Sequence, residues 1–456
     1  MSLELFDSKE QRLREFVPLT PGHVEMYVCG PTVQSEPHLG HLRSALVYDV
    51  LRRWLMASGF TVTMVRNVTD IDDKVLVNAG SRDWLEFAKE VEKTFDAAYQ
   101  SLGILEPTHK PHATEHIQDM VALTEKLIEL GHAYQAEDGS ANVFFDTASW
   151  SNYGELTNQK LENMEGEAEA SFGRRSPHDF ALFKAHKSDE PESAAWQTPW
   201  GMARPGWHIE CSAMAKHFLG ESFDIHGGGL DLRFPHHENE LAQSRAAGDR
   251  FANFWLHNAL ITISGNKMSK SLGNGVSIAE LTTQGSWSAI RYWLLSANYR
   301  SNLDYNPSSI VESQAALDRI TGFIHRAGLD LKADSSKLPE AFVTAMNSDL
   351  NVPAALAVLH DQVRLGNLAI DEKSETLRDH VLAVLSMLNV LGLDMALEAV
   401  EVSPELAQQI ERLIAKRNQA KADKDFALAD SIRDELVAMG VTIKDLPDKT
   451  IWSING

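Results

Sequence analysis

Short apolar runs separated by a helical pattern characterise the first part of the chain. Met26 to Cys29 is an apolar run that ends at Gly30-Pro31, and Thr61 to Asn67 is a second one. Between them, Ser44 to Met56 has apolar residues at three- and four-residue intervals, and Gly59 follows as a helix stop. Strand, glycine-bearing turn, helix and strand predict a βαβ unit in an open parallel α/β domain, with ligands at the carboxyl ends of its strands.

The strand pattern is interrupted and resumes later. Residues 101–198 show helical spacing at first and then an irregular region that includes the acidic stretch 162–170. The runs at 223–229 and 254–263 return to the strand-and-glycine pattern. We therefore expect the α/β domain to comprise residues 1–100 and 199–265, with residues 101–198 inserted between them.

The remainder of the chain is mainly helical in pattern. Residues 308–400 have apolar positions at helical spacing with few strand signals, which predicts a helical bundle. Leu406 to Met439 reads as one charged helix, followed by the stop Gly440 and a small hairpin formed by Val441 to Ile443 and Thr450 to Trp452. Residues 401–456 are thus expected to form a small α+β region.

Length and composition narrow the class of protein. A chain of 456 residues exceeds the size of a single core, so it should contain several domains. Met1 to Phe16 is too polar for a signal peptide, and the most apolar later stretch, His380 to Leu397, is interrupted by polar residues. We expect a soluble, cytoplasmic protein without a membrane span. Two cysteines form no disulfide framework.

The net charge of −22 argues against whole-surface attraction to nucleic acid, because phosphate binding relies on lysine and arginine. A local basic face is still compatible with this charge. An ordinary solvated helix would explain the basic residues near the C-terminus equally well. These residues are Arg412, Lys416, Arg417, Lys421 and Lys424.

Two short segments carry residue types that suit phosphate chemistry. His38 and His41 are three residues apart, so at a helix start they would share one face, and Gly40 would allow close approach of a nucleotide. Two ordinary surface histidines would fit this segment alone. The second segment, Lys267-Met268-Ser269-Lys270-Ser271, places two ammonium groups and two hydroxyls in one loop. Together the segments predict stabilisation of the charge that develops in nucleotidyl transfer.

These segments resemble the two signatures of class I aminoacyl-tRNA synthetases, which form an aminoacyl-adenylate from ATP and then acylate tRNA. The resemblance narrows to the cysteinyl-tRNA synthetase family and covers almost the whole chain, through Met26 to Ser44, Arg66 to Lys74, Arg204 to Met214, Phe223 to Ser244, Asp349 to Pro353 and Asp425 to Asp430. Two positions depart from the family pattern. Leu39 replaces the usual isoleucine of the first signature, and Gln34 stands where many relatives carry tyrosine.

The resemblance implies a fold, a reaction and partners. It implies a Rossmann-like catalytic domain with an insertion on the acceptor-stem side at residues 101–198. A region with the lysine loop and stem contacts would follow the catalytic domain at residues 266–307. An anticodon-recognition region would follow the bundle at residues 401–456. The implied reaction activates L-cysteine with ATP, accompanied by Mg2+, and transfers the cysteinyl group to tRNA(Cys). We expect the protein to act as a monomer.

The resemblance also implies site residues. It assigns catalysis to His38, His41, Lys267 and Lys270. The ATP-binding residues would be Gly40, Gly228, Gly229, Asp231 and Lys270, because glycines permit close approach and a carboxylate accepts from ribose hydroxyls. The cysteine-binding residues would be Thr69, Trp207 and His226, although an ordinary core position would also explain Trp207 and His226.

The two cysteines lead to a metal-site prediction. Cys29 and Cys211 combine with His236 and Glu240, which are four residues apart and would share a helix face, whereas His237 and Glu238 would point elsewhere. Thiolate and imidazole donors favour zinc over magnesium or calcium. From spacing alone, burial explains the cysteines better. The resemblance reverses this preference, because these four positions match the family's zinc ligands. It implies one Zn2+ per chain that selects the substrate thiol. We therefore expect no editing domain.

Two other functions remain open at this stage. One is a ligase that adenylates cysteine and transfers it to an aminosugar, as in mycothiol-pathway enzymes, which resemble only the catalytic portion. The other is a nucleic-acid-binding or regulatory protein that has lost catalysis. The long C-terminal region argues against the first, and both intact signatures argue against the second. Cysteine-dependent ATP–pyrophosphate exchange separates the protein that has lost catalysis from the two ligases.

Overall fold

The computed structural model describes residues 2–160, 173–263, 265–267, 276–397, 404–439, 441–445 and 450–454. At its centre lies a four-stranded sheet in the order β11-β10-β3-β4. All neighbouring strands in it are parallel. The strands are β3 (His23–Val28), β4 (Thr61–Arg66), β10 (Ser222–Gly229) and β11 (Phe251–Asn258). The predicted parallel α/β core is confirmed.

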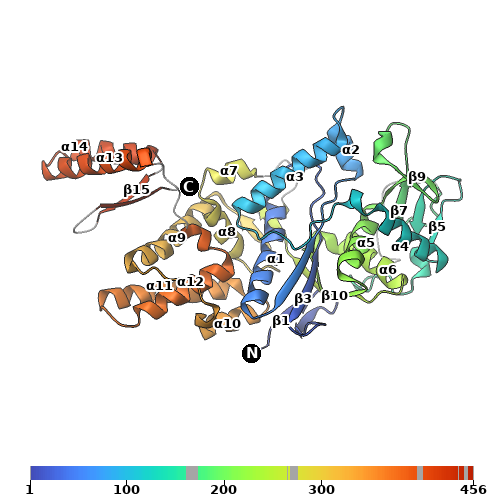
Figure 1. Ribbon diagram of the computed structural model, residues 1–456, viewed down its shortest axis with the longest axis horizontal. Helices are drawn as coiled ribbons and strands as arrows, with labels where there is room; N and C mark the ends of the chain where they lie inside the picture. The colour runs from blue at the N-terminus through green and yellow to red at the C-terminus, as the bar shows by residue number, and fades with distance from the viewer. Residues whose placement is uncertain are drawn as a thin grey trace.

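Helices cover this sheet on both sides. Helix α1 (Leu39–Ala57) contacts β4, β10 and β11, while α5 (Trp207–Leu219) contacts β10 and α6 (Glu238–Ala246) contacts β11. Figure 1 shows α1 on one side of the sheet and α5 and α6 on the other. Burial on both faces explains the consecutive buried residues Met26 to Val28 in the second half of β3.

Helix α1 begins five residues before Ser44, where the helical periodicity starts, and so includes the helix start considered for His38 and His41. The imidazole of His38 caps it, because Nδ1 accepts a hydrogen bond from the Gly40 amide at 3.1 Å. Leu39 and Leu42 are fully buried, so the first turn is already held by the core. The cap is a histidine, which is not among the usual capping residues, so sequence rules do not mark this start.

The inserted region contains a sheet that the sequence did not predict, and this sheet extends beyond the expected boundary at residue 198, to Pro205. Helix α4 (Ile117–Glu129) is followed by a five-stranded antiparallel sheet in the order β5-β6-β7-β9-β8. Its strands are β5 (Ala133–Gln135), β6 (Val143–Phe145), β7 (Phe180–Ala185), β8 (Trp196–Thr198) and β9 (Gly201–Pro205). Three of these strands have only three residues, too few for periodicity to reveal. The acidic stretch 162–170 lies outside the described residues.

The predicted helical bundle is confirmed. It consists of α9 (Pro307–Ala327), α10 (Glu340–Asn347), α11 (Val352–Asp371) and α12 (Leu377–Leu391). Arg291 of α8 (Trp287–Leu295) ties the bundle to the catalytic core. Its buried guanidinium donates to the Leu391 carbonyl and pairs with Asp49 of α1.

The C-terminal region differs from its prediction in one respect. In place of one charged helix there are two, α13 (Pro404–Ala422) and α14 (Phe426–Ala438), which pack together. The break occurs at Lys424, where φ is 63°, and Asp425 caps α14. The predicted hairpin is present as antiparallel β15 (Val441–Asp445) and β16 (Thr450–Ile454). Four of the five basic residues near α13 are exposed, whereas Arg417 is buried.

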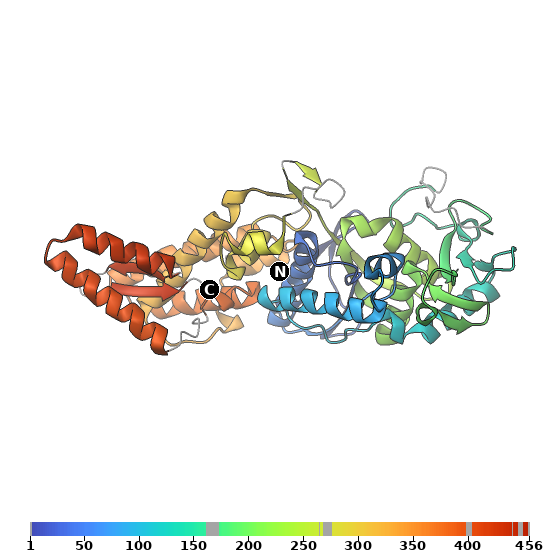
Figure 2. The same cartoon turned by 90° about the horizontal axis from the view of Figure 1, so that it is seen from above.

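The molecule is elongated. Figures 1 and 2 show α13 and α14 at one end, the inserted sheet around β5 at the other, and the parallel sheet between them. The remaining elements connect these parts: β1 (Glu4–Asp7), β2 (Arg12–Glu15), α2 (Asp73–Ala79), α3 (Trp84–Ser101), β12 (Ile261–Ile263), β13 (Asn266–Lys267), α7 (Ile278–Thr282) and β14 (Leu303–Tyr305). Among the described helices, none is long and apolar enough to cross a lipid bilayer.

Candidate functional site

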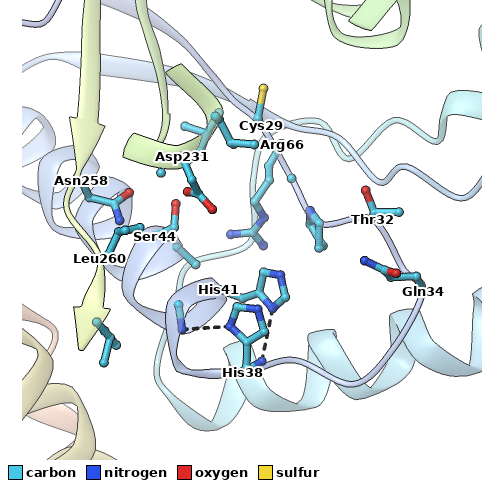
Figure 3. Close-up of a pocket in the computed structure, with 18 of the residues that line it drawn as sticks. Cys29, Thr32, Gln34, His38, His41, Ser44, Arg66, Asp231, Asn258 and Leu260 are labelled. Carbon is cyan, nitrogen blue, oxygen red and sulfur yellow. Dashed lines mark hydrogen bonds between the residues drawn. The ribbon is translucent and has the colours of Figure 1, made fainter. Parts of the chain in front are cut away.

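A pocket of about 320 Å3 opens at the carboxyl ends of β3, β4 and β10. A parallel sheet places ligands at this edge. The pocket brings together seven of the residues predicted from the sequence, which are Cys29, His38, Gly40, His41, Trp207, Gly229 and Asp231. Figure 3 shows the histidines on one side of the pocket, with Asp231 and Cys29 across from them.

His38 and His41 lie side by side at the start of α1, as their spacing predicts. Their rings are stacked with centroids 3.7 Å apart. The His38 amide donates to His41 Nδ1 at 3.2 Å, so the two residues form a reciprocal cap. This arrangement holds both imidazoles beside the helix N-terminus, where anions are stabilised.

Arg66 is a pocket residue that the sequence reasoning did not assign to the site. It is the last residue of β4, it is 4% exposed, and its guanidinium lies 4.6 Å from the Tyr99 ring centroid. Within the described part of the chain, its Nη1 is buried without a hydrogen-bond partner. The sequence did contain a signal for Arg66, because it is a charged residue at the end of an apolar strand. Ligands bind at the carboxyl ends of parallel strands.

The glycines at the end of β10 are packed too closely for side chains. A Cβ on Gly228 would lie 2.7 Å from the His237 ring, and one on Gly229 would lie 2.6 Å from Asp231. The Gly228 amide donates to the Tyr48 hydroxyl at 2.6 Å. This segment is therefore a fixed backbone wall, and Gly229 and Asp231 line the pocket while Gly228 lies behind it.

The lysine segment is only partly described. The backbone of Lys267 belongs to β13 and pairs with Thr262 of β12. Lys270 and the side chain of Lys267 lie outside the part of the chain that the structure describes. Their catalytic assignment stays a prediction.

The four predicted metal ligands come together behind the pocket. Cys29 Sγ lies 3.7 Å from Cys211 Sγ and 3.4 Å from Glu240 Oε1, and His236 Nε2 lies 3.0 Å from the same oxygen. Each residue offers one donor atom within 4.8 Å of all the others. Cys211, His236 and Glu240 are at most 1% exposed, whereas Cys29 borders the pocket. We call these four residues the buried donor cluster.

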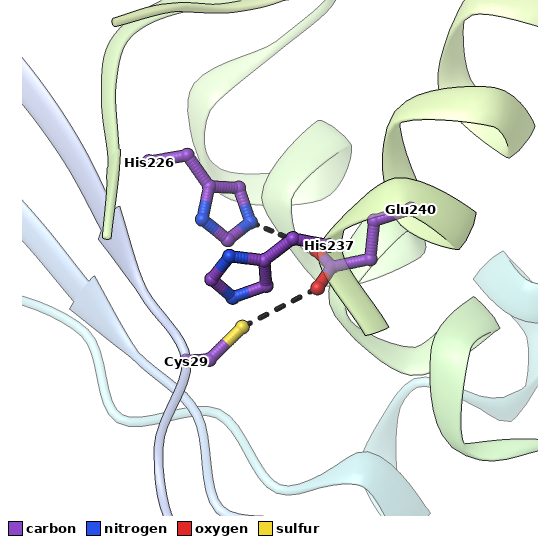
Figure 4. Close-up of side chains that lie close together, drawn as sticks. All are labelled: Cys29, His226, His237 and Glu240. Atoms are coloured by element: carbon purple, nitrogen blue, oxygen red, sulfur yellow. Dashed lines mark hydrogen bonds and ion pairs between the residues drawn. The ribbon is translucent and has the colours of Figure 1, made fainter. Parts of the chain in front are cut away.

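The prediction that His237 points away from the cluster is wrong. The backbone departs from helical geometry at Phe234 (φ −139°, ψ 133°), and His236 and His237, which follow it, are both almost completely buried. His237 packs against His226 with ring centroids 4.5 Å apart, and it forms an alternative donor group with Cys29, His226 and Glu240. Figure 4 shows this group. Glu238 does point elsewhere, since its carboxylate accepts from the Thr157 amide at 2.8 Å.

The three residues predicted to bind cysteine lie in different surroundings. The Trp207 ring stacks on His236 at 4.1 Å and lines the pocket, so it lies beside the buried donor cluster, of which Cys29 borders the same pocket. Thr69 is buried and its hydroxyl donates to Glu210 Oε2 at 2.8 Å. His226 is fully buried, with Nε2 2.8 Å from Glu240 Oε2. Neither Thr69 nor His226 is among the residues that line the pocket.

Members of the buried donor cluster shift one another's pKa values. Burial alone would raise the pKa of Cys211, but hydrogen bonds with Cys29 and His236 lower it to about 6. Burial opposes protonation of His236, yet Glu240 and Cys211 raise its pKa to about 10. Burial, together with Cys211, raises the pKa of the Cys29 thiol well above its usual range.

The donor set fits a zinc ion. In tetrahedral zinc sites the ligand atoms lie about 2.0–2.3 Å from the metal, so neighbouring donors are roughly 3.3–3.8 Å apart. The sulfur–sulfur and sulfur–oxygen distances above fall in this range. His208 Nδ1 lies 3.0 Å from His236 Nδ1, which leaves His236 Nε2 facing the cluster. Such outer contacts orient metal-binding imidazoles.

Three protein families match successive parts of the chain. One described as tRNA synthetases class I (C) catalytic domain matches residues 15–315, the DALR domain matches residues 341–396, and the cysteinyl-tRNA ligase anticodon binding domain matches residues 403–452. A solved structure of Mycobacterium tuberculosis methionyl-tRNA synthetase with methionyl-adenylate has a TM-score of 0.57 at 16% identity. The superposition covers 82% of this chain and 91% of that structure, so the two proteins share a fold.

Curated relatives extend over the full length. Cysteine–tRNA ligase from Clavibacter sepedonicus is 52% identical, with 100% of both chains covered. Cysteine–tRNA ligase from Leifsonia xyli subsp. xyli is 53% identical, again over 100% of both chains. The full-length match, together with the pocket at the sheet edge, shows that the chain belongs to the cysteine–tRNA ligase family of class I aminoacyl-tRNA synthetases.

Proposed function

We propose that the chain activates L-cysteine with ATP to give cysteinyl-adenylate and pyrophosphate, and then transfers the cysteinyl group to a terminal ribose hydroxyl of tRNA(Cys). One observation carries this proposal. The pocket joins a sulfur-containing donor cluster on one side to a helix N-terminus with two histidines on the other. The first suits a thiol substrate, and the second suits a triphosphate.

The phosphate side of the pocket would stabilise the charge that develops in adenylation. His38 and His41 supply imidazoles beside the amides of the first turn of α1, and Arg66 supplies a guanidinium with a free donor. We infer that these groups contact the phosphates of ATP, which would bind with Mg2+. Lys267 and Lys270 would complete the set from the adjoining segment, because ammonium groups stabilise a leaving pyrophosphate.

The nucleoside side is proposed to lie along the end of β10. Gly40 and Gly229 would allow the nucleotide to approach the backbone, and Asp231 would accept hydrogen bonds from ribose hydroxyls. Gly228 would contribute through its packing against His237, which keeps the wall in place. These roles follow from position and chemistry.

For the amino acid, we propose that Cys29, Cys211, His236 and Glu240 hold one Zn2+. Zinc, when bound there, would recognise the substrate sulfur as a thiolate, which serine cannot provide. Trp207 would form the apolar wall beside the substrate. His226 would position Glu240 through their 2.8 Å contact, and Thr69 would position Glu210 in the same way.

The helical bundle and the C-terminal region support tRNA as acceptor over an aminosugar. They match the DALR domain and the anticodon binding domain respectively, which a ligase confined to the catalytic portion would lack. We propose that α13 and α14 contact the anticodon end while the pocket receives the acceptor end. The elongated shape in Figure 2 suits two distant contacts on one monomer.

Two assays test this function. Cysteine-dependent ATP–pyrophosphate exchange without tRNA is expected for a cysteine-activating ligase, and its absence would overturn the proposal. Charging of tRNA(Cys) compared with an aminosugar then identifies the acceptor. Exchange with charging of the aminosugar alone would retain the activation step but contradict the tRNA acceptor.

A further inference from the structure

A second group of metal-type donors lies outside the pocket, where α4 meets α5. It consists of His116 and Asp119 at the start of α4 and His217 in the last turn of α5. None of the three is among the pocket-lining residues. We propose that this group, the surface donor cluster, binds one divalent transition-metal ion.

The donor spacing suits a single ion. Asp119 Oδ2 lies 2.8 Å from His116 Nδ1 and 3.1 Å from His217 Nδ1. These distances bracket the 3.0 Å between His236 Nε2 and Glu240 Oε1 in the buried donor cluster. Tetrahedral zinc with bonds of about 2.0–2.1 Å places neighbouring nitrogen and oxygen ligands roughly 3.3 Å apart, so movements of a few tenths of an ångström suffice.

Packing holds the two imidazoles in place. The ring centroids of His116 and His217 are 4.8 Å apart, and the ring planes are inclined at 68°. Phe218 packs against both, with centroids 5.3 Å from His116 and 4.7 Å from His217. Because the donors come from two helices that already contact each other, binding costs little ordering of the chain.

The charge of the cluster favours a cation. In the described part of the chain, the ion-pair partners of Asp119 are the two imidazoles, with no lysine or arginine among them. Metal binding uses an imidazole lone pair, so the carboxylate of Asp119 is the charge that an ion would meet here, and the chain as a whole carries −22. A divalent ion would compensate the carboxylate and accept both imidazole lone pairs.

The donor types indicate the class of metal. Two imidazoles and one carboxylate suit zinc, nickel or cobalt, whereas magnesium and calcium prefer oxygen ligands alone. The side chains of Asp119 and His217 are 41% and 46% exposed, so water can complete the coordination and the ion can exchange. The ion would link α4 of the inserted region to α5 of the catalytic core.

The test is metal stoichiometry of the full-length protein. Metal-free wild type, His217→Ala and Asp119→Asn are dialysed against zinc, and bound zinc is measured by atomic emission. We expect each variant to bind one equivalent fewer than wild type, or to bind that equivalent at least about tenfold more weakly, since even outer contacts of metal ligands are worth 10–100-fold in affinity. His325→Ala, which removes an exposed histidine of α9, is the matched control and should bind as wild type does.

Cobalt separates the two donor clusters. When both proteins are loaded with cobalt in place of zinc, wild type should bind one more cobalt ion than His217→Ala. This additional ion should add no thiolate-to-cobalt charge-transfer absorption, because the surface donor cluster contains no sulfur. Zinc should also raise the unfolding midpoint of wild type more than that of Asp119→Asn. Equal zinc content and equal midpoints in wild type and both variants would overturn the proposal, as would the same loss in His325→Ala. The comparison stands whether or not the buried donor cluster holds a metal.

Discussion

The two sides of the pocket differ in burial and in how their side chains are held. The buried donor cluster has Cys211, His236 and Glu240 almost inaccessible, each fixed by neighbouring side chains. His38 and His41, in contrast, are half-buried and stack on each other at the start of α1, with His41 also against Phe95. The difference suggests a division of roles, in which a rigid interior selects the substrate sulfur and accessible groups at a helix terminus meet the changing phosphate charge.

The largest expected effect is at the sulfur side. Cys211→Ser replaces a soft donor with a hydroxyl, so we expect metal content to fall and discrimination against serine to drop by about 10³-fold or more, because sites that reject an analogue through a specific polar contact reach 10⁴–10⁵. Metal analysis and exchange kinetics with both amino acids measure this. A variant with full metal content and full discrimination would remove Cys211 from the ligand set.

The phosphate side should respond in turnover rather than in substrate selection. His41→Asn is expected to lower kcat of exchange by about 10²–10³-fold, the usual loss for one preorganised donor, with little change in KM for cysteine. His112→Asn, which alters a half-buried histidine away from the pocket, serves as control. A rise in KM for cysteine at constant kcat in His41→Asn would contradict the assignment of separate roles to the two sides of the pocket.

His226 tests whether the rigidity of the buried donor cluster matters. His226→Gln removes the imidazole that contacts Glu240 Oε2, so we expect metal affinity to fall by about 10–100-fold. The variant should keep its kcat when metal is supplied in excess. Unchanged affinity would show that Glu240 is positioned without His226, and a kcat loss that excess metal does not restore would indicate direct contact of His226 with cysteine.

Arg66 should give the smallest effect. Arg66→Gln removes a charged donor from the pocket and should raise KM for ATP by roughly tenfold, the equivalent of one hydrogen bond to a charged group, while KM for cysteine stays constant. Kinetics with both substrates varied will show this. An equal rise in both KM values would mean that Arg66 supports the pocket through its packing on Tyr99 instead.

The sequence predicted the parallel core from short apolar runs such as Met26 to Cys29 on either side of a helical pattern, and the helical bundle from apolar residues at helical spacing. It missed the inserted sheet, since strands such as β5 and β6 have three residues each and are stabilised by partners distant in the chain. It also merged α13 and α14, because the break at Lys424 is a left-handed residue that carries no glycine or proline signal.

For the site, residue chemistry and family resemblance together predicted the buried donor cluster, and the structure brings its four members together. The position of His237 could not be predicted, because α6 is buried on nearly every side and a residue that faces away from Glu240 is still in the interior. Arg66 was overlooked because its role depends on where β4 ends. The surface donor cluster joins residues about a hundred positions apart, and only the contact between α4 and α5 reveals it.

The most direct test of the central claim compares cysteine and serine in ATP–pyrophosphate exchange, with the protein first loaded with zinc and then stripped of metal. Our account predicts exchange that strongly prefers cysteine in the loaded protein, and loss of both that activity and that preference after stripping, with recovery when zinc is restored. Full cysteine-dependent exchange in metal-free wild type, with serine still rejected, would contradict it.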